Sequence, residues 1–184
     1  SKKFWSYIKC RRSENIGVGT LRSHGKLITE PLEKAETLNK QFQSVFTPQT
    51  EPKRSTIKRG AMPKITIGVE GVEAELKRLN PNKASGPDNL SPRVLKECAS
   101  IIAPLLRTLY QKSLDTSAVP YDWKQATVSP VFKKGDRYQP ANYRPISLTC
   151  ICSKIMEHII TSNMKRYLES NHLLHHRQHG FRAQ

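Results

Sequence analysis

Residues 126–148 have the sequence ATVSPVFKKGDRYQPANYRPISL, and this stretch decides the fold that we expect. Its first seven residues are rich in β-branched and aromatic side chains, a composition typical of a β-strand. Pro130 removes one backbone donor from that strand and therefore indicates an edge position or a bulge. Residues 133–136 (KKGD) are a turn signal, and residues 142–148 can return as the antiparallel partner. The stretch predicts one small β-hairpin.

Helical periodicity dominates the sequence on both sides of this hairpin. Apolar side chains recur at three- and four-residue spacing in four segments, which are residues 29–46, 69–79, 91–110 and 148–169. Thr29 is the expected N-cap of the first segment, and Pro104 predicts a kink or a break into two helices inside the third. A short basic helix is also expected over residues 1–12. The predicted fold class is therefore α+β, mostly helical with a small antiparallel β-hairpin, and it forms an incomplete domain.

The composition divides the chain into three parts. We expect residues 1–46 to form a helical N-terminal extension, and residues 47–68, which are polar, basic and proline-bearing, to form a flexible linker. Residues 69–184 contain the hairpin and the longer helical segments and are expected to be the main domain. The chain starts Ser1-Lys2-Lys3 without a methionine and stops shortly after a glycine–phenylalanine pair. Both ends are therefore expected to be internal points of a longer protein.

The strongest bulk signal is the charge. The chain has 31 Lys and Arg against 15 Asp and Glu, a formal net charge of +16, and residues 1–60 and 61–184 each contribute +8. A field of this sign attracts polyanions through counterion release, which points to nucleic acid, with a merely solvated basic surface as the alternative. The longest apolar stretch, residues 101–106, is too short for a membrane span, and no signal-peptide pattern opens the chain. We therefore expect an intracellular protein, in the cytoplasm or the nucleus, with no membrane partner.

Neither the cysteines nor the histidines form a recognisable metal site. The cysteines include one C-x-C pair, Cys150 and Cys152, without a second pair at zinc-ligand spacing, so reduced and mostly buried thiols are expected. A histidine cluster near the C-terminus could bind a metal, and it comprises His172, His175, His176 and His179. Because the cluster lacks cysteine or carboxylate partners at ligand spacing, we favour a basic turn that faces RNA.

The hairpin is the place where the sequence brings cations together. Lys133 and Lys134 leave its first strand beside the glycine of the turn, and Arg144 lies eleven residues beyond Lys133 on the returning strand. A compact ammonium and a forked guanidinium are suited to phosphate oxygens. The three residues are therefore candidates for a phosphate-binding site, with ordinary exposed turn charges as the alternative.

A series of short segments from Asn80 onward carries a family resemblance. They are residues 83–88 (KASGPD), 120–124 (PYDWK), 130–137 (PVFKKGDR) and 142–148 (NYRPISL), Lys154 with Glu157, and residues 178–182 (QHGFR). In this order they resemble the reverse transcriptase of non-LTR retrotransposons of the LINE or jockey-like class. Residues 1–50 resemble, less specifically, the stretch that joins endonuclease to polymerase in such elements, through Phe4-Trp5 and residues 38–46 (LNKQFQSVF).

This resemblance implies that residues 69–184 form a partial reverse transcriptase domain, the fingers of a right-hand polymerase and the start of its palm. It implies that Arg144, together with Lys133 or Lys134, binds the triphosphate of an incoming deoxynucleotide. Which of the two lysines makes the contact stays open. It also implies a template-proximal turn at the C-terminal end, formed by Gln178, Gly180, Phe181 and Arg182.

The catalytic chemistry that the resemblance implies uses two Mg²⁺ ions held by palm aspartates, including an adjacent Asp-Asp pair. The sequence contains only Asp88, Asp115, Asp122 and Asp136, none adjacent to another. We therefore expect no catalytic residue, no metal ligand and no polymerase activity in this segment alone. The expected function is that of a fragment of an RNA-directed DNA polymerase, which binds an RNA or DNA template-primer and a dNTP in the intact enzyme. The alternatives are a non-catalytic nucleic-acid-binding remnant and a helical interaction module.

Overall fold

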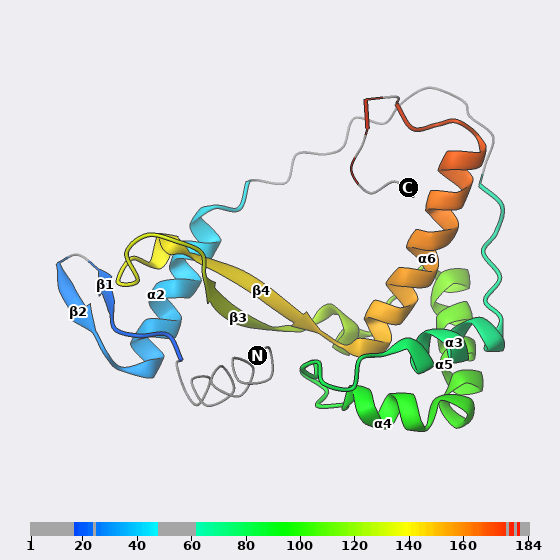
Figure 1. The fold of residues 1–184 in the computed structure, drawn as a ribbon, viewed down its shortest axis with the longest axis horizontal. Coiled ribbons are helices and arrows are strands. Elements are labelled where there is room, and N and C mark those ends of the chain that lie inside the picture. The colour runs from blue at the N-terminus through cyan, green and yellow to red at the C-terminus, as the bar shows by residue number, and fades with distance from the viewer. Residues whose placement is uncertain (1–16, 24, 48–61, 176, 179, 181–184) are drawn as a thin grey trace, which may run out of the picture. The chain divides into compact units, whose positions relative to one another are not determined.

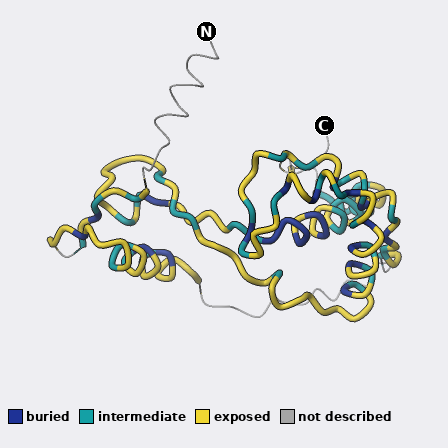
Figure 2. Tube along the Cα trace, turned by 90° about the horizontal axis from the view of Figure 1, so that it is seen from below, coloured by how far each residue is buried: buried dark blue, intermediate teal, exposed yellow. Residues whose placement is uncertain are grey.

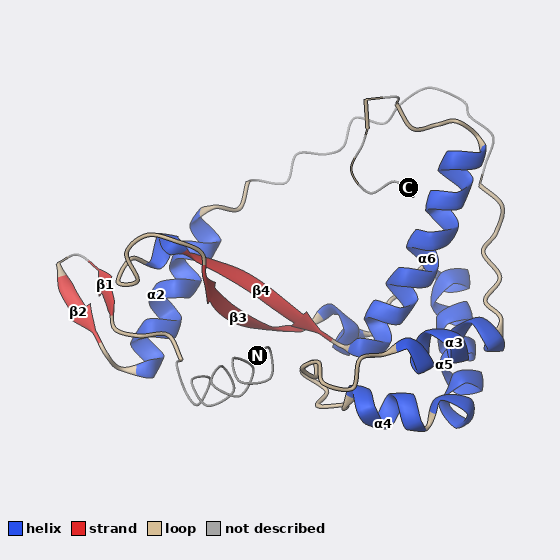
Figure 3. Cartoon of the chain, viewed as in Figure 1, coloured by secondary structure: helices blue, strands red, loops and turns tan. Residues whose placement is uncertain are grey.

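The computed structural model describes residues 17–23, 25–47, 62–175, 177, 178 and 180, which Figure 1 draws in colour. The helix expected over residues 1–12 lies outside these residues. Within them the chain is mostly helical and contains two antiparallel two-stranded sheets (Figure 3). The predicted α+β class is therefore confirmed, and the structure adds a second hairpin to the one that the sequence predicted.

The chain divides into two compact units, each with a hydrophobic core of its own. Unit 1 comprises residues 1–53 and 128–146, and unit 2 comprises residues 54–127 and 147–184. Figure 2 shows buried positions along the chain in both units. Unit 1 is therefore discontinuous in sequence, because the central hairpin joins an N-terminal segment.

A β-hairpin that the sequence did not predict opens the described part of unit 1. Strand β1 (Leu21–Ser23) pairs antiparallel with β2 (Lys26–Ile28), and Leu21 lies opposite Ile28. Gly25 in the connecting loop has a φ of +81°, a left-handed conformation that glycine adopts without steric cost. Leu21 and Ile28 are both buried, so this short hairpin forms one side of the unit 1 core.

Helix α2 (Pro31–Ser44) contributes a second side of that core. Its buried residues Leu38 and Phe42 are four positions apart and therefore share a face. Pro31 occupies the first turn, where its missing amide donor costs no hydrogen bond, and Glu30 is the N-cap. The prediction of Thr29 as the N-cap is wrong by one residue, because Pro31 fixes the first helical position directly after Glu30.

The predicted central hairpin is confirmed. Strand β3 (Ala126–Phe132) pairs with β4 (Tyr143–Thr149), and a short 3-10 helix, η2 (Pro140–Asn142), leads into the returning strand. Phe132 and Tyr143 contact each other edge to face, with ring centroids 5.6 Å apart. Both rings pack into the unit 1 core, so the hairpin is anchored by one of its two faces.

Unit 2 is helical, and its core lies among α3 (Val69–Arg78), α4 (Pro92–Glu97), α5 (Ala99–Thr116) and α6 (Ile151–Ser170). Tyr110 of α5 is fully buried, and its hydroxyl donates to the Cys152 carbonyl of α6 over 2.8 Å. Trp123, in the 3-10 helix η1 (Tyr121–Lys124), packs edge to face on Tyr110 with ring centroids 5.6 Å apart. One tyrosine therefore ties together α5, η1 and α6.

The break between α4 and α5 falls at Cys98. This residue has φ −93° and ψ +17°, and its carbonyl accepts from the amides of both Ile101 and Ile102. Pro104 lies inside α5, which continues through it. The prediction of a break into two helices at Pro104 is wrong, and the alternative of a kink stays a prediction. The ring removes the donor for the Ser100 carbonyl, and Ser100 is exposed, so water can satisfy that group.

Residues 62–68 belong to the packed part of unit 2. The Ile67 amide donates to Oε1 of Gln111 over 3.0 Å, and Nε of Arg107 donates to the Ile67 carbonyl over 3.0 Å. Ile67 itself is 2% exposed and lies in the core. This extended segment therefore lies along α5, and the domain boundaries drawn from the composition stay a prediction.

Candidate nucleic-acid interface

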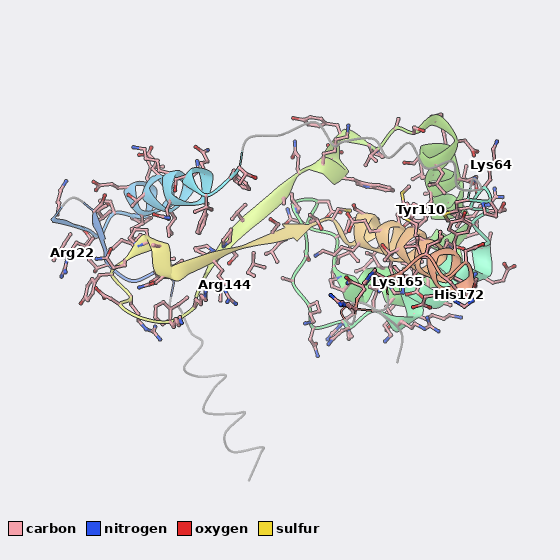
Figure 4. All side chains as sticks on the ribbon, turned by 90° about the horizontal axis from the view of Figure 1, so that it is seen from above. Arg22, Lys64, Tyr110, Arg144, Lys165 and His172 are labelled. Carbon is pink, nitrogen blue, oxygen red and sulfur yellow. The ribbon has the colours of Figure 1, made fainter. Side chains whose placement is uncertain are left out.

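The three predicted phosphate-binding cations lie at one end of the β3–β4 hairpin. Lys133 directly follows β3, and Lys134 lies in the turn. Arg144, which is labelled in Figure 4, is the second residue of β4. All three are exposed. Among the described residues none of the three forms an ion pair with an acid. The hairpin therefore presents three cations that are available to an anionic ligand.

The pairing of the strands places Lys133 and Arg144 on the same face. The Lys133 amide donates to the Asn142 carbonyl over 2.8 Å, a register that sets Phe132 opposite Tyr143. Because side chains alternate between the two faces of a strand, Lys133 and Arg144 lie on the face opposite the two aromatic rings. They are diagonal neighbours, a spacing that long side chains can bridge.

Hydrogen bonds inside the tip of the hairpin fix its backbone. The Asp136 carboxylate accepts from the Tyr138 amide over 2.9 Å, and the Asn142 side-chain amide donates to the Asp136 carbonyl over 2.9 Å. The Tyr143 hydroxyl donates to the Arg137 carbonyl over 2.8 Å. Gly135 turns the chain at a φ of +90°, where a larger residue would be strained. Hydrogen bonds therefore hold the backbone at the end of the hairpin where the cations lie.

Two arginines that the sequence did not single out also lie at this tip. The Arg137 guanidinium lies over the Phe132 ring at 4.7 Å from its centroid, and that of Arg22 lies over the Tyr138 ring at 5.4 Å. The Arg22 amide donates to the Tyr138 carbonyl over 2.7 Å, which joins β1 to the tip. Arg137 could have been found from its place in the turn sequence. Arg22 could not, because only the folded unit brings it to Tyr138.

The predicted template-proximal residues belong to unit 2. Gln178 and Gly180 are exposed, and Nε2 of Gln178 donates to the Gly180 carbonyl over 3.0 Å. Phe181 and Arg182 lie outside the described residues. The two groups of predicted site residues therefore belong to different units.

The described residues contain neither a metal cluster nor a membrane span. No group of three or more His, Cys, Asp or Glu side chains in this part of the chain could hold a metal ion. Of the C-terminal histidines, His172 and His175 are described, and His176 and His179 are not. No described helix is both long and apolar enough to cross a bilayer.

The two buried thiols of unit 2 are not nucleophiles at neutral pH. Burial, with a smaller contribution from the neighbouring Cys150 and Asp88, raises the pKa of Cys152 to about 12. Burial also raises the pKa of Cys150, as does its hydrogen bond with the Asp88 side chain. Both thiols therefore stay protonated near pH 7, and the prediction of free, buried cysteines is confirmed for this pair.

Comparison with known proteins finds homology to one family. No protein-family model matches the chain. The chain is 28% identical over 151 residues to a probable RNA-directed DNA polymerase from transposon BS of Drosophila melanogaster. It is 31% identical over 107 residues to a probable RNA-directed DNA polymerase from transposon X-element of the same species. It is also 26% identical over 164 residues to the RNA-directed DNA polymerase from mobile element jockey. The chain is a distant homologue of non-LTR retrotransposon reverse transcriptases.

The homology to these reverse transcriptases concerns a segment of each. The matches cover 80%, 58% and 83% of this chain, in the order given above, but 17%, 12% and 18% of the three relatives. The resemblance found in the sequence is therefore confirmed at the level of the family. This reverse transcriptase homologue spans less than a fifth of each of the three proteins.

Proposed function

We propose that this chain is the fingers segment, with the beginning of the palm, of an RNA-directed DNA polymerase of a non-LTR retrotransposon. In this proposal residues 69–184 are the partial polymerase domain. Residues 1–46 are a helical extension, and residues 47–68 connect the two. The homology to a segment of three retrotransposon polymerases supports this assignment.

The observation that carries the proposal is the cation cluster on the hairpin. Lys133, Lys134 and Arg144 are exposed at one end of the β3–β4 hairpin, in a chain whose formal net charge is +16. The contact between Phe132 and Tyr143 anchors the opposite face of the hairpin in the unit 1 core. The cations therefore face solvent while the backbone that carries them is held in place.

In the intact polymerase these cations would bind the triphosphate of the incoming dNTP. Negative charge develops on phosphoryl oxygens during nucleotidyl transfer, and cations that are already in position stabilise it. Arg144 can present two N–H donors to one phosphate group. The ammonium of Lys133 or Lys134 would neutralise a further oxygen.

The same proposal places Gln178, Gly180, Phe181 and Arg182 next to the template-primer, which would be RNA or DNA. Glycine lets a strand approach the backbone closely, and a phenylalanine ring can stack on a base. Mg²⁺ supplies the Lewis-acid chemistry of such polymerases. The described residues contain no cluster that fits this ion. Because the sequence has no adjacent pair of aspartates, we propose that this segment binds nucleic acid and dNTP without joining them.

Two other functions have an observation in their favour. The sequence has no adjacent aspartates, which favours a non-catalytic nucleic-acid-binding remnant. The α5 helix exposes apolar side chains, with Ile101 at 79% and Leu105 at 63%, which favours a helical interaction module. The remnant would need the hairpin cations for nucleic acid but not for dNTP. The interaction module would need them for neither.

The test is the salt dependence of binding of a fluorescein-labelled single-stranded oligonucleotide to the full chain. The variant Lys133→Ala/Lys134→Ala/Arg144→Ala removes three candidate phosphate contacts. It should reduce the slope of log affinity against log salt by about 2 and weaken binding by about tenfold near 0.1 M salt. The control Lys40→Ala/Arg93→Ala/Lys112→Ala removes the same charge from three exposed positions elsewhere and should weaken binding by less than about twofold.

Direct binding of a dNTP separates the alternatives. We expect a fluorescently labelled dNTP to bind the wild-type chain and to bind the hairpin variant much more weakly. Equal losses of nucleic-acid binding in the hairpin variant and in its control would refute a specific role for the hairpin. Binding of the dNTP that is the same in both chains would favour the remnant, and oligonucleotide binding that does not change with salt would favour the interaction module.

A further inference from the structure

A hollow in unit 2 has no place in the function proposed above. It has a volume of about 530 Å³ and lies between α3, the loop that follows α3, and the first turns of α6. Its apolar lining is aliphatic and consists of Leu79, Ala84, Pro92, Leu148, Ile151 and Ile155. Its polar lining consists of Glu75, Arg78, Asn80, Lys83, Lys154 and His158. This volume, with a mostly apolar lining and a few charged groups, is typical of a binding pocket.

Positive charge is in excess around this hollow. Glu75 is the one acid among the described residues that line it, and two basic groups share it. Its Oε1 is 2.7 Å from Nη1 of Arg78, and its Oε2 is 3.6 Å from Nε2 of His158. Lys83 and Lys154 have no acidic partner among the described residues. Both ammonium groups are therefore available to a carboxylate brought by a ligand.

The loop that carries Lys83 and Ala84 is held in place from several sides. The Asn82 amide donates to Oδ1 of Asn80 over 3.0 Å, and Nζ of Lys96 donates to the Leu79 carbonyl over 3.1 Å. Further along the loop, Gly86 lies so close to the Cys150 backbone that a Cβ would come within 2.7 Å of it. The hollow is thus pre-formed, and a ligand need not order the loop.

We propose that this hollow docks an acidic amphipathic peptide segment of another protein. One bulky apolar side chain of the peptide would fill the aliphatic hollow. Carboxylates on either side of that side chain would pair with Lys83 on the loop and Lys154 on α6. This is the usual mode in which a short helix binds a groove, with apolar anchors at its centre and charges at its edges.

The chemistry of the hollow favours such a peptide over the other macromolecules that a basic protein attracts. Bases bound by proteins are commonly stacked on the large rings of Phe, Tyr or Trp, and none of these residues is among the described lining residues. A second copy of this chain is disfavoured, because two molecules of net charge +16 repel each other. Carboxylates with an apolar anchor match both the aliphatic lining and the two lysines.

The probe is a fluorescein-labelled peptide of fourteen residues, built from Glu and Ala with one central Phe, and its binding to the full chain is measured by anisotropy. We expect Lys83→Glu/Lys154→Glu to weaken binding at least tenfold. Replacement of the Phe of the peptide by Ala should have a similar effect. Ala84→Trp, which places a ring in the hollow at an exposed loop position, should also block binding. The control Lys40→Glu/Lys112→Glu makes the same change in charge elsewhere and should bind within about twofold of wild type.

A charge swap makes the test specific. A second peptide with Lys in place of Glu should bind the Lys83→Glu/Lys154→Glu variant better than it binds the wild-type chain. Equal loss in the control variant, or no effect of removing the peptide Phe, would overturn the proposal, because binding would then be general attraction to a basic surface. Loss of oligonucleotide binding in the Lys83→Glu/Lys154→Glu variant, with peptide binding retained, would assign the hollow to nucleic acid instead.

Discussion

At the scale of single residues, Gly86 shows how one position fixes the fit between two segments of unit 2. Only glycine fits at this position without a clash, because an added Cβ would lie 2.7 Å from the Thr149 carbonyl oxygen and 2.7 Å from the Cys150 amide nitrogen. Backbone atoms cannot rotate away as the end of a flexible side chain can, so a methyl group must push the loop and the start of α6 apart. The composition of the loop predicted a bend but not this contact.

Gly86→Ala should therefore lower the free energy of unfolding by about 1–3 kcal/mol, the usual cost of overpacking. Gly71→Ala is the matched control, because the same methyl group inside α3 meets no atom within 4 Å. There the better helix propensity of alanine should raise the free energy of unfolding by about 0.5–1 kcal/mol. Urea unfolding followed by tryptophan fluorescence measures both. Two changes of the same sign would contradict the close approach at Gly86.

At the scale of elements, α5 carries a proline that its helix tolerates. Pro104→Ala gives the Ser100 carbonyl a donor and removes the ring from the helix interior. The gain is offset in part by the greater freedom of the unfolded chain, so we expect the free energy of unfolding to rise by about 1–2 kcal/mol. Ile101→Ala, at an exposed position of the same helix, should change it by less than about 0.5 kcal/mol. A less stable Pro104→Ala variant in urea unfolding would show that the proline ring packs favourably.

How well an element could be predicted depended on how local its cause is. The hairpin of β3 and β4 was predicted because β-branched residues and a glycine turn act within a few positions of one another. The hairpin of β1 and β2 was missed because strands of three residues show no periodicity, and only the burial of Leu21 and Ile28 reveals their role. The helix break was misplaced because Cys98, unlike Pro104, gives no local signal.

The same distinction holds for the candidate sites. Lys133 and Arg144 could be predicted to share a hairpin, because the turn between them is a local feature. The place of Arg22 at the hairpin tip, and the meeting of Lys83 with Lys154 around one hollow, depend on packing between segments that are far apart in sequence. Charge patterns along the chain predicted a polyanion partner, but they could not predict which cations converge.

At the scale of the whole molecule, the two units carry equal net positive charge although each has a hydrophobic core of its own. Unit 1 has 14 Lys and Arg against 6 Asp and Glu, and unit 2 has 17 against 9, so each unit carries +8. When the pH rises through the range in which lysine ammonium groups lose their protons, the repulsion between positive charges falls in both units. The effect of one buried group on the free energy of unfolding at alkaline pH must therefore be measured as a difference between the wild-type chain and a variant that has the same lysines.

Cys152 is a buried group for which that difference can be measured. Its pKa rises from an ordinary value of 9.0 to about 12 on folding, so between these values the folded protein keeps a proton that the unfolded chain releases. The stabilising contribution is complete below pH 9 and is lost as the pH rises towards 12. From pH 8 to about pH 10.5, the wild-type chain should lose about 1–2 kcal/mol more unfolding free energy than Cys152→Ala. Ile155→Val, a substitution at a buried position of the same helix, should keep the wild-type loss; parallel curves for wild type and Cys152→Ala would show that the thiol does not stay protonated in the folded state.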